Sequence, residues 1–154
     1  MAWLWIVLGL LAVVGSLTWI LPSPMERRQG ERRMAALKLG MKVRMLSVDD
    51  WVKERLDVVQ LSQYSIWTDK KPRSASLWRG PDRDEPWASP PEAHSWDLLS
   101  GEFGELLGSL PDDIVGVGAE NGCVWVALDD AKAAIEPDAI KPLLDRILTL
   151  LATR

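Results

Sequence analysis

The residues that could do acid–base or metal chemistry are few and widely separated in this chain. His94 is the single histidine, and a general base needs an orienting partner, whereas Glu92 and Asp97 are near it only in sequence. Cys123 is the single cysteine, so an intrachain disulfide is impossible and no Cys/His ligand set exists. We therefore predict an exposed loop histidine and a small, buried core cysteine.

Two pairs of adjacent aspartates flank a predicted hairpin, Asp112-Asp113 before it and Asp129-Asp130 after it. Paired carboxylates at one end of a sheet could bind a divalent cation. Turns and helix ends favour Asp without a ligand, however, so we predict no metal site. The glycine-rich "GVGAENG" opens no helix and lacks the geometry of a phosphate-binding loop. These patterns predict a protein that is not an enzyme and uses no cofactor.

Charge divides the 154 residues into three segments. Residues 1–22 carry no charged side chain, and residues 23–48 hold seven Lys or Arg against two Glu. The remaining residues, 49–154, hold 11 Lys or Arg against 20 Asp or Glu. Because phosphate contacts need clustered cations, the net-acidic body argues against a nucleic-acid partner. No small-molecule substrate is evident from the sequence.

The uncharged first segment predicts a transmembrane helix over residues 1–22. "AWLWIVLGLLAVVGSLTWIL", residues 2–21, would form a helix of about 30 Å, the thickness of a bilayer's hydrocarbon core. Trp3 and Trp5 near one end and Trp19 near the other suit the two membrane interfaces. A signal peptide is the alternative, but the run is too long and lacks a positive n-region and a small-x-small cleavage site.

Small residues within this segment indicate a second role. Gly9, Ala12 and Ser16 fall on one helical stripe, at spacings of three and four. Because small side chains let another helix approach closely, the stripe is a candidate face for helix packing. The alternative is that these residues are simply common in any apolar helix.

The basic segment predicts a juxtamembrane helix over residues 23–40. "SPME" supplies a Ser-x-x-Glu capping box, and Gly40 is suited to end the helix. Positive residues near a span stay on the cytoplasmic side, so we expect a periplasmic amino terminus and a cytoplasmic domain, residues 41–154, at the inner membrane. The residues expected to contact anionic headgroups of the lipid bilayer are Arg27, Arg28, Arg32 and Arg33.

The order of these segments also resembles a known family. An apolar helix, a proline turn and the run "MERRQGERRMAALKLGMKV" are similar to YajC, the accessory subunit of the bacterial preprotein translocase, and to YajC-like single-span proteins of Gram-negative bacteria. The resemblance covers residues 1–46. Pro22-Ser23-Pro24 replaces the family's Arg-Pro-Gln turn, and no functional residue carries over. The resemblance implies an inner-membrane protein associated with the translocase.

The third segment predicts a small α+β domain. Period-two or β-branched patterns indicate strands at residues 41–45, 58–68 and 74–80, and helices are expected at 48–56 and 101–110. The four prolines in residues 81–95 indicate a long surface loop. Three tryptophans occupy strand positions and are expected in the core: Trp67, Trp78 and Trp125.

The clearest local signal is the pair Asn121-Gly122, which favours a two-residue type I′ turn and a hairpin over residues 114–128. Counting outward pairs Ala119 with Val124, Val117 with Val126, and Val115 with Leu128, and places Trp125 opposite Gly118. The apolar period of the last 18 residues predicts a terminal amphipathic helix, with Pro142 either in its first turn or at its start. We therefore expect an antiparallel sheet packed by a C-terminal helix.

Three functional hypotheses follow from these patterns. The first is a non-catalytic interaction or accessory subunit of a membrane complex, which contacts a partner through Trp87 and Trp96 beside the polar loop. These two tryptophans could alternatively fold back onto the sheet. The second is a membrane-tethered sensor or small-ligand domain, which a pocket near Trp125 would favour. The third is a translocase-associated, YajC-like accessory protein.

Overall fold

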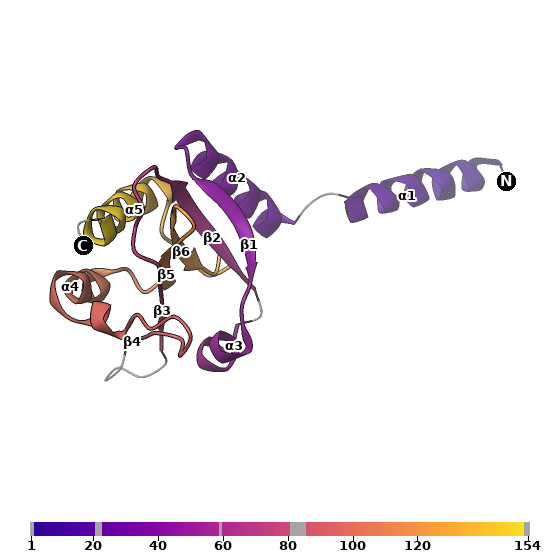
Figure 1. Cartoon of the computed structure of the whole chain (residues 1–154). Helices are drawn as coiled ribbons and strands as arrows, with labels where there is room; N and C mark the ends of the chain where they lie inside the picture. The colour runs from indigo at the N-terminus through magenta and orange to yellow at the C-terminus, as the bar shows by residue number, and fades with distance from the viewer. Residues whose placement is uncertain (1, 21–22, 59, 81–85, 153–154) are drawn as a thin grey trace. The chain divides into compact units, whose positions relative to one another are not determined.

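The computed structural model describes residues 2–20, 23–58, 60–80 and 86–152 (Figure 1). The elements, in chain order, are α1 (Ala2–Ile20), α2 (Pro24–Lys38), β1 (Lys42–Ser47), α3 (Asp50–Leu56), β2 (Gln60–Trp67), β3 (Ala75–Arg79), β4 (Trp87–Ala88), the 3₁₀ helix η1 (Trp96–Leu99), α4 (Gly101–Ser109), β5 (Ile114–Glu120), β6 (Cys123–Leu128) and α5 (Pro137–Ala152). The chain divides into two compact units, residues 1–31 and 32–154, and the boundary falls within α2.

The predicted transmembrane anchor is wrong. The apolar run does form a helix, but among the described residues no helix combines the length and apolar character needed to cross a bilayer. The single-pass inner-membrane localisation, with its periplasmic amino terminus and cytoplasmic domain, is therefore also corrected, and the juxtamembrane role of residues 23–40 depended on it.

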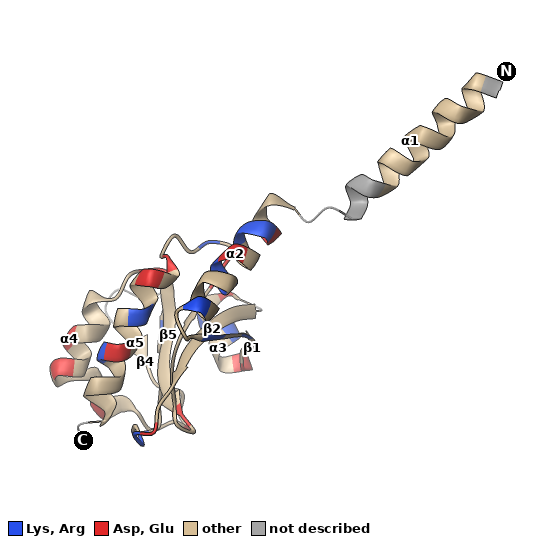
Figure 2. Ribbon diagram, turned by 90° about the horizontal axis from the view of Figure 1, so that it is seen from above, with Lys and Arg blue, Asp and Glu red and all other residues tan. Residues whose placement is uncertain are grey.

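α2 begins at the predicted capping box. The Ser23 backbone N–H donates to Glu26 Oε2 at 2.6 Å, and the Glu26 N–H donates to Ser23 Oγ at 3.2 Å. This reciprocal pair satisfies two backbone donors that have no partner within the helix. The helix ends at Lys38, and Gly40 follows with φ +78°, the left-handed stop that glycine favours. Figure 2 shows in blue the positions of Lys and Arg along this helix.

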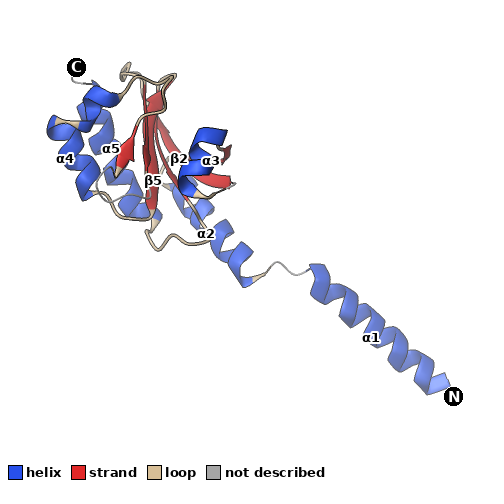
Figure 3. Ribbon diagram, turned by 90° about the horizontal axis from the view of Figure 1, so that it is seen from below, coloured by secondary structure: helices blue, strands red, loops and turns tan. Residues whose placement is uncertain are grey.

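The second unit is the predicted α+β fold. Six strands of the described chain form one antiparallel sheet in the order β1-β2-β6-β5-β3-β4. Helices α4 and α5 lie on one side of this sheet and α3 lies on the other (Figure 3). The helix-packed antiparallel sheet that the hydrophobic pattern predicts is thus present.

The first face of the sheet carries the main core. Tyr64 and Ile66 of β2 and Val126 of β6 point to this face, because alternate residues of a strand share a side. They pack with Ile140 and Leu144 of α5, which are fully buried. The predicted apolar stripe of the terminal helix therefore supplies one wall of the core.

The second face is covered by α3. Val52 of this helix belongs to the same buried cluster as Leu61 of β2 and Ala127 of β6. Trp78 and Trp125 belong to the same cluster, with ring centroids 5.5 Å apart. Both tryptophans are therefore in the core, as predicted.

Trp67 does not follow its predicted core placement. It is the last residue of β2 and 66% exposed. Its strand position is correct, but the cluster under α3 does not include it. Strand pattern alone therefore misplaced this side chain, because burial also needs a covering element.

The hairpin register is mostly the predicted one. Asn121 and Gly122 have φ of 51° and 76°, as a type I′ turn requires. The pairs Ala119–Val124, Val117–Val126 and Gly118–Trp125 are confirmed. Leu128 pairs with Ile114 instead of Val115, because an irregularity between Ile114 and Gly116 shifts the register. This extra residue turns Val115 toward the second face.

Two local predictions need correction. The segment 81–95 is not loop throughout, because Trp87–Ala88 form β4 and pair with β3; residues 81–85 lie outside the described residues. α5 begins at Pro137, so Pro142 lies beyond the first turn, inside the helix. Pro137 takes the first helical position, where a proline loses no hydrogen bond.

Candidate functional site

The candidate acids and bases of the sequence have separate partners. Asp97, three residues after His94, forms a two-bond ion pair with Arg73. Asp112 pairs with Arg79 at 3.1 Å, and Asp113 accepts the N–H groups of residues 134 and 135. Within the described ranges, no three His, Cys, Asp or Glu residues come together as metal ligands.

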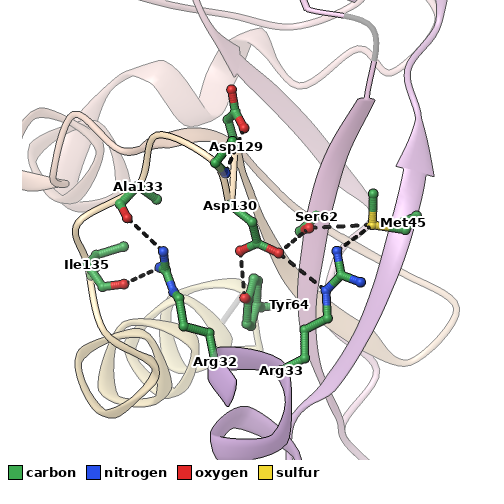
Figure 4. Close-up of polar contacts among 10 residues, drawn as sticks. Arg32, Arg33, Met45, Ser62, Tyr64, Asp129, Asp130, Ala133 and Ile135 are labelled. Carbon is green, nitrogen blue, oxygen red and sulfur yellow. Dashed lines mark hydrogen bonds and ion pairs between the residues drawn. The ribbon is translucent and has the colours of Figure 1, made fainter. Parts of the chain in front are cut away.

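A buried polar group lies around Asp130, and we call it the Asp130 cluster: Arg33, Ser62, Tyr64 and Asp130 (Figure 4). Ser62 and Tyr64 are two residues apart on β2, so both point to the first face. Asp130 follows the end of β6, the neighbouring strand. Arg33 comes from α2.

Asp130 is the centre of this cluster. Its side chain is 4% exposed. The Tyr64 hydroxyl donates to Oδ1 at 2.7 Å, and the Ser62 hydroxyl donates to Oδ2 at 2.5 Å. Arg33 Nε lies 3.5 Å from Oδ2. The carboxylate therefore has hydrogen-bond donors and an opposite charge, the two conditions for burying an anion.

Arg32 binds the chain that follows Asp130. Its guanidinium donates to the carbonyl of Ala133 at 2.6 Å and to the carbonyl of Ile135, and the residue is 7% exposed. Arg32 and Arg33 were predicted to face lipid headgroups, and the structure places both in contacts within the second unit. Arg27 and Arg28 are exposed on α2. Arg32 and Arg33 thus contact the second unit, whereas Arg27 and Arg28 are exposed to solvent.

The contacts of the Asp130 cluster indicate a structural role. Burial, together with the hydrogen bond to Asp130, raises the pKa of Tyr64 well above its usual value. The phenol therefore stays protonated and remains a donor at neutral pH. Because both carboxylate oxygens already accept hydrogen bonds, we interpret the cluster as a polar link between α2, β2 and the end of β6.

The raised pKa of Tyr64 predicts a loss of stability at high pH. An unfolded tyrosine titrates near pH 10, so above that pH the folded protein binds more protons than the unfolded one. The free energy of unfolding should be fully retained below about pH 10 and then fall by up to roughly 1.4 kcal/mol per pH unit. Urea unfolding between about pH 8 and 11 measures this slope.

Tyr64→Phe is the control, because Tyr64 is the single tyrosine of the chain. Its free energy of unfolding should be lower overall but flatter across the same pH range. An equally steep decline in both proteins would contradict the assignment.

The two tryptophans predicted to contact a partner line one cleft. Trp87 is 6% exposed, donates its indole N–H to the Leu107 carbonyl at 3.1 Å, and lies under the Arg79 guanidinium. Trp96 is 52% exposed. Both border a cleft of about 390 Å³, with Gly104 among its other lining residues. Trp87 is therefore a core residue with one side on the cleft, and Trp96 is the exposed one.

A second hollow, of about 230 Å³, lies beside Trp125 on the second face of the sheet. Its lining is polar and aromatic, and we call it the sheet hollow: Lys42, Arg44, Gln63, Ser65, Trp67, Glu120, Asn121, Cys123 and Trp125. Cys123 is half-buried at this hollow, so its predicted core placement is wrong. Lys42 and Arg44 were missed, although their alternation in "MKVRM" places both on one strand face.

α1 presents an exposed apolar surface. Its described large side chains are 43–80% exposed: Trp3, Leu4, Trp5, Ile6, Val7, Leu8, Leu10, Leu11, Val13 and Val14. The predicted stripe of Gly9, Ala12 and Ser16 is exposed too, and the Ser16 hydroxyl is satisfied by the Val13 carbonyl at 2.8 Å. The side chain of Trp19 lies outside the described residues.

Comparison with known proteins adds no assignment. No protein-family model, curated protein or solved structure matches this chain. The resemblance to YajC-like proteins therefore stays a prediction from residues 1–46.

Proposed function

We propose that this protein is a non-catalytic interaction protein in which α1 binds an apolar helix of a partner protein. The observation that carries the proposal is the exposure of every described large apolar side chain of α1, from Trp3 to Val14. Monomeric soluble proteins rarely expose contiguous apolar patches larger than a few hundred Å². A surface of this kind gains free energy when a partner removes it from water.

The stripe of small residues supports a helix as the partner. The distance between packed helices depends on the side chains at the contact. A Cβ added at Gly9 meets nothing within 4 Å, so this position leaves open space against the helix. Ala12 and Ser16 lie on the same side of α1 and also have small side chains. A second helix can therefore approach closely along the stripe, while the larger residues on either side enclose it.

The second unit supports the non-catalytic part of the proposal. Asp97, the acidic residue three positions after His94, forms an ion pair with Arg73. The carboxylate of Asp130 is committed to the Ser62 and Tyr64 hydroxyls. We infer that the α+β unit is a folded module that α1 attaches to its partner. The identity of that partner is the object of the experiment.

Site-specific photo-cross-linking in the native cell tests the proposal. A benzoylphenylalanine replaces Trp5, on the side of the stripe, or Val14, about 140° around the helix from Gly9. We expect position 5 to yield one discrete protein adduct and position 14 to yield much less. Adducts with lipid alone, or the same adducts from both positions, would overturn the proposal.

A matched pair of glycine variants tests the stripe itself. Gly9→Leu places a large side chain on the stripe, where the partner helix would approach. Gly15→Leu adds the same side chain at a position about 120° around the helix from Gly9. A Cβ meets nothing within 4 Å at either glycine, so α1 itself tolerates both changes. Loss of the adduct with Gly9→Leu only supports helix packing at the stripe. Equal loss, or no loss, in the two variants contradicts it.

A further inference from the structure

The sheet hollow arises because the second face is covered at one end only. α3 covers the part of this face where Leu61 of β2 lies. Val52 of α3 and Leu61 belong to one buried cluster. Six residues further along β2, Trp67 is 66% exposed. Between them, Gln63 and Ser65 form the floor of the hollow, since alternate residues of β2 share this face. The uncovered end is thus a shallow site with strand side chains as its base.

The ring of Trp125 closes the inner side of the hollow. Trp125 pairs with Gly118 on β5, and a Cβ there would lie only 2.4 Å from Trp125 Cζ2. The indole therefore lies over bare backbone on β5. With the ring seated on that side, the space toward β2 and β1 stays open. The glycine at this register position is what permits the arrangement.

Two cations face the hollow from the edge strand. Lys42 pairs with Ser65 and Arg44 pairs with Gln63, so both share the floor's face. Neither Lys42 nor Arg44 forms an ion pair with a carboxylate of the described residues. Glu120 is the acidic group of the lining, and Asn121 donates to its carboxylate at 3.2 Å. The lining carries a net positive charge.

The thiol of Cys123 experiences the same two cations. Burial raises the pKa of Cys123, while Lys42 and Arg44 act in the opposite direction. Both positive charges therefore lie close enough to affect a group inside the hollow. An anion bound at this place would benefit from them in the same way.

We infer that the sheet hollow is a binding site for a small anion that carries one flat ring, such as an aromatic phosphate or carboxylate. Lys42 and Arg44 bind the anionic group, and Trp67 offers its exposed ring face to the flat part. The volume of about 230 Å³ is below the roughly 300–1,000 Å³ of drug-sized pockets, so a single ring is the fitting size. The inference is independent of α1 and its partner.

Binding can be measured with the full chain labelled with 5-fluorotryptophan, by ¹⁹F NMR. Phenyl phosphate is the probe. Inorganic phosphate supplies the anionic group without a ring, and benzyl alcohol supplies the ring without a charge. We expect phenyl phosphate to shift the Trp67 and Trp125 signals and to bind about tenfold or more tightly than either half. The Trp96 signal, from the other cleft, should not move.

Arg44→Gln and Arg146→Gln form a matched pair, since both residues are exposed arginines. Arg44→Gln should weaken phenyl phosphate binding by about tenfold, and Arg146→Gln should leave it unchanged. Lys42→Gln is a second variant of the site with the same expected loss. Equal affinity in all these proteins, or a shift of Trp96 as large as that of Trp67, overturns the inference.

Discussion

Replacing Asp130 by alanine is expected to lower the free energy of unfolding by about 3–5 kcal/mol. The change leaves the Ser62 and Tyr64 hydroxyls without their acceptor, and it removes the carboxylate that faces Arg33. Buried donors that lose their partner cost about 1–3 kcal/mol each. Urea unfolding followed by circular dichroism measures the effect.

Asp145→Ala is the matched control for this prediction. Asp145 also pairs with a cation, Lys141, but that pair lies one helical turn apart on the exposed side of α5. An exposed pair of this kind contributes about 0.3–0.5 kcal/mol. We expect the control to stay within about 0.5 kcal/mol of the wild type. A similar small effect for Asp130→Ala would show that the Asp130 cluster does not stabilise the unit.

Replacing Gly118 by valine is expected to destabilise the sheet by about 3 kcal/mol. An added Cβ would lie 2.3 Å from the Ala75 carbonyl oxygen on β3 and 2.4 Å from Trp125 Cζ2 on β6. The first contact is with backbone, so β3 and β5 would have to separate. The melting temperature by circular dichroism reports the loss, and the Trp125 ¹⁹F signal should move as the ring is displaced.

Gly108→Ala tests whether any added side chain has this effect. Gly108 lies in α4, and a Cβ there meets nothing within 4 Å. Because alanine has the higher helix propensity, this variant should be up to about 1 kcal/mol more stable than the wild type. A Gly118→Val protein that melts at the wild-type temperature would show that the sheet relaxes around the new side chain.

These two variants also separate the roles of the two faces. Asp130→Ala acts on the first face, where α2 joins the sheet, and it leaves the Trp125 ring in place. Gly118→Val acts on the second face and pushes Trp125 toward the sheet hollow. If the hollow binds an aromatic anion, the valine variant should lose binding even at temperatures where it remains folded.

Local signals in the sequence determined most of the elements and part of their pairing. Asn121-Gly122 predicted the hairpin turn because both residues tolerate positive φ, and the register follows from the turn. The box of Ser23 and Glu26 predicted the start of α2, since its hydrogen bonds lie within four residues. The apolar period of α5 predicted its buried side. Each of these features depends on neighbours in the chain.

The uniform apolar character of the first segment led to a wrong prediction. The run from residue 2 to residue 21 predicted a membrane span, and the helix it forms does not meet the requirements for one. Pro142 was assigned to a first turn, although α5 begins five residues earlier at Pro137. The error at Pro142 concerns a helix boundary, and helix ends depend on which backbone groups find partners.

Only the tertiary structure decided which side chains form sites. Arg32 and Arg33 belong to a basic run that suggested a membrane surface, and their contacts lie with residues about 100 positions away. Trp67 and Trp125 lie on the same face of the sheet, but only Trp125 belongs to the buried cluster that contains Val52 of α3. By itself, then, the sequence determined the helices α1 to α5, five of the strands and the hairpin turn, because local hydrogen bonds and periodicity specify them, whereas β4 was predicted as loop. Burial, ion pairing and the hollow beside Trp125 required the fold, because they depend on segments that only packing brings together.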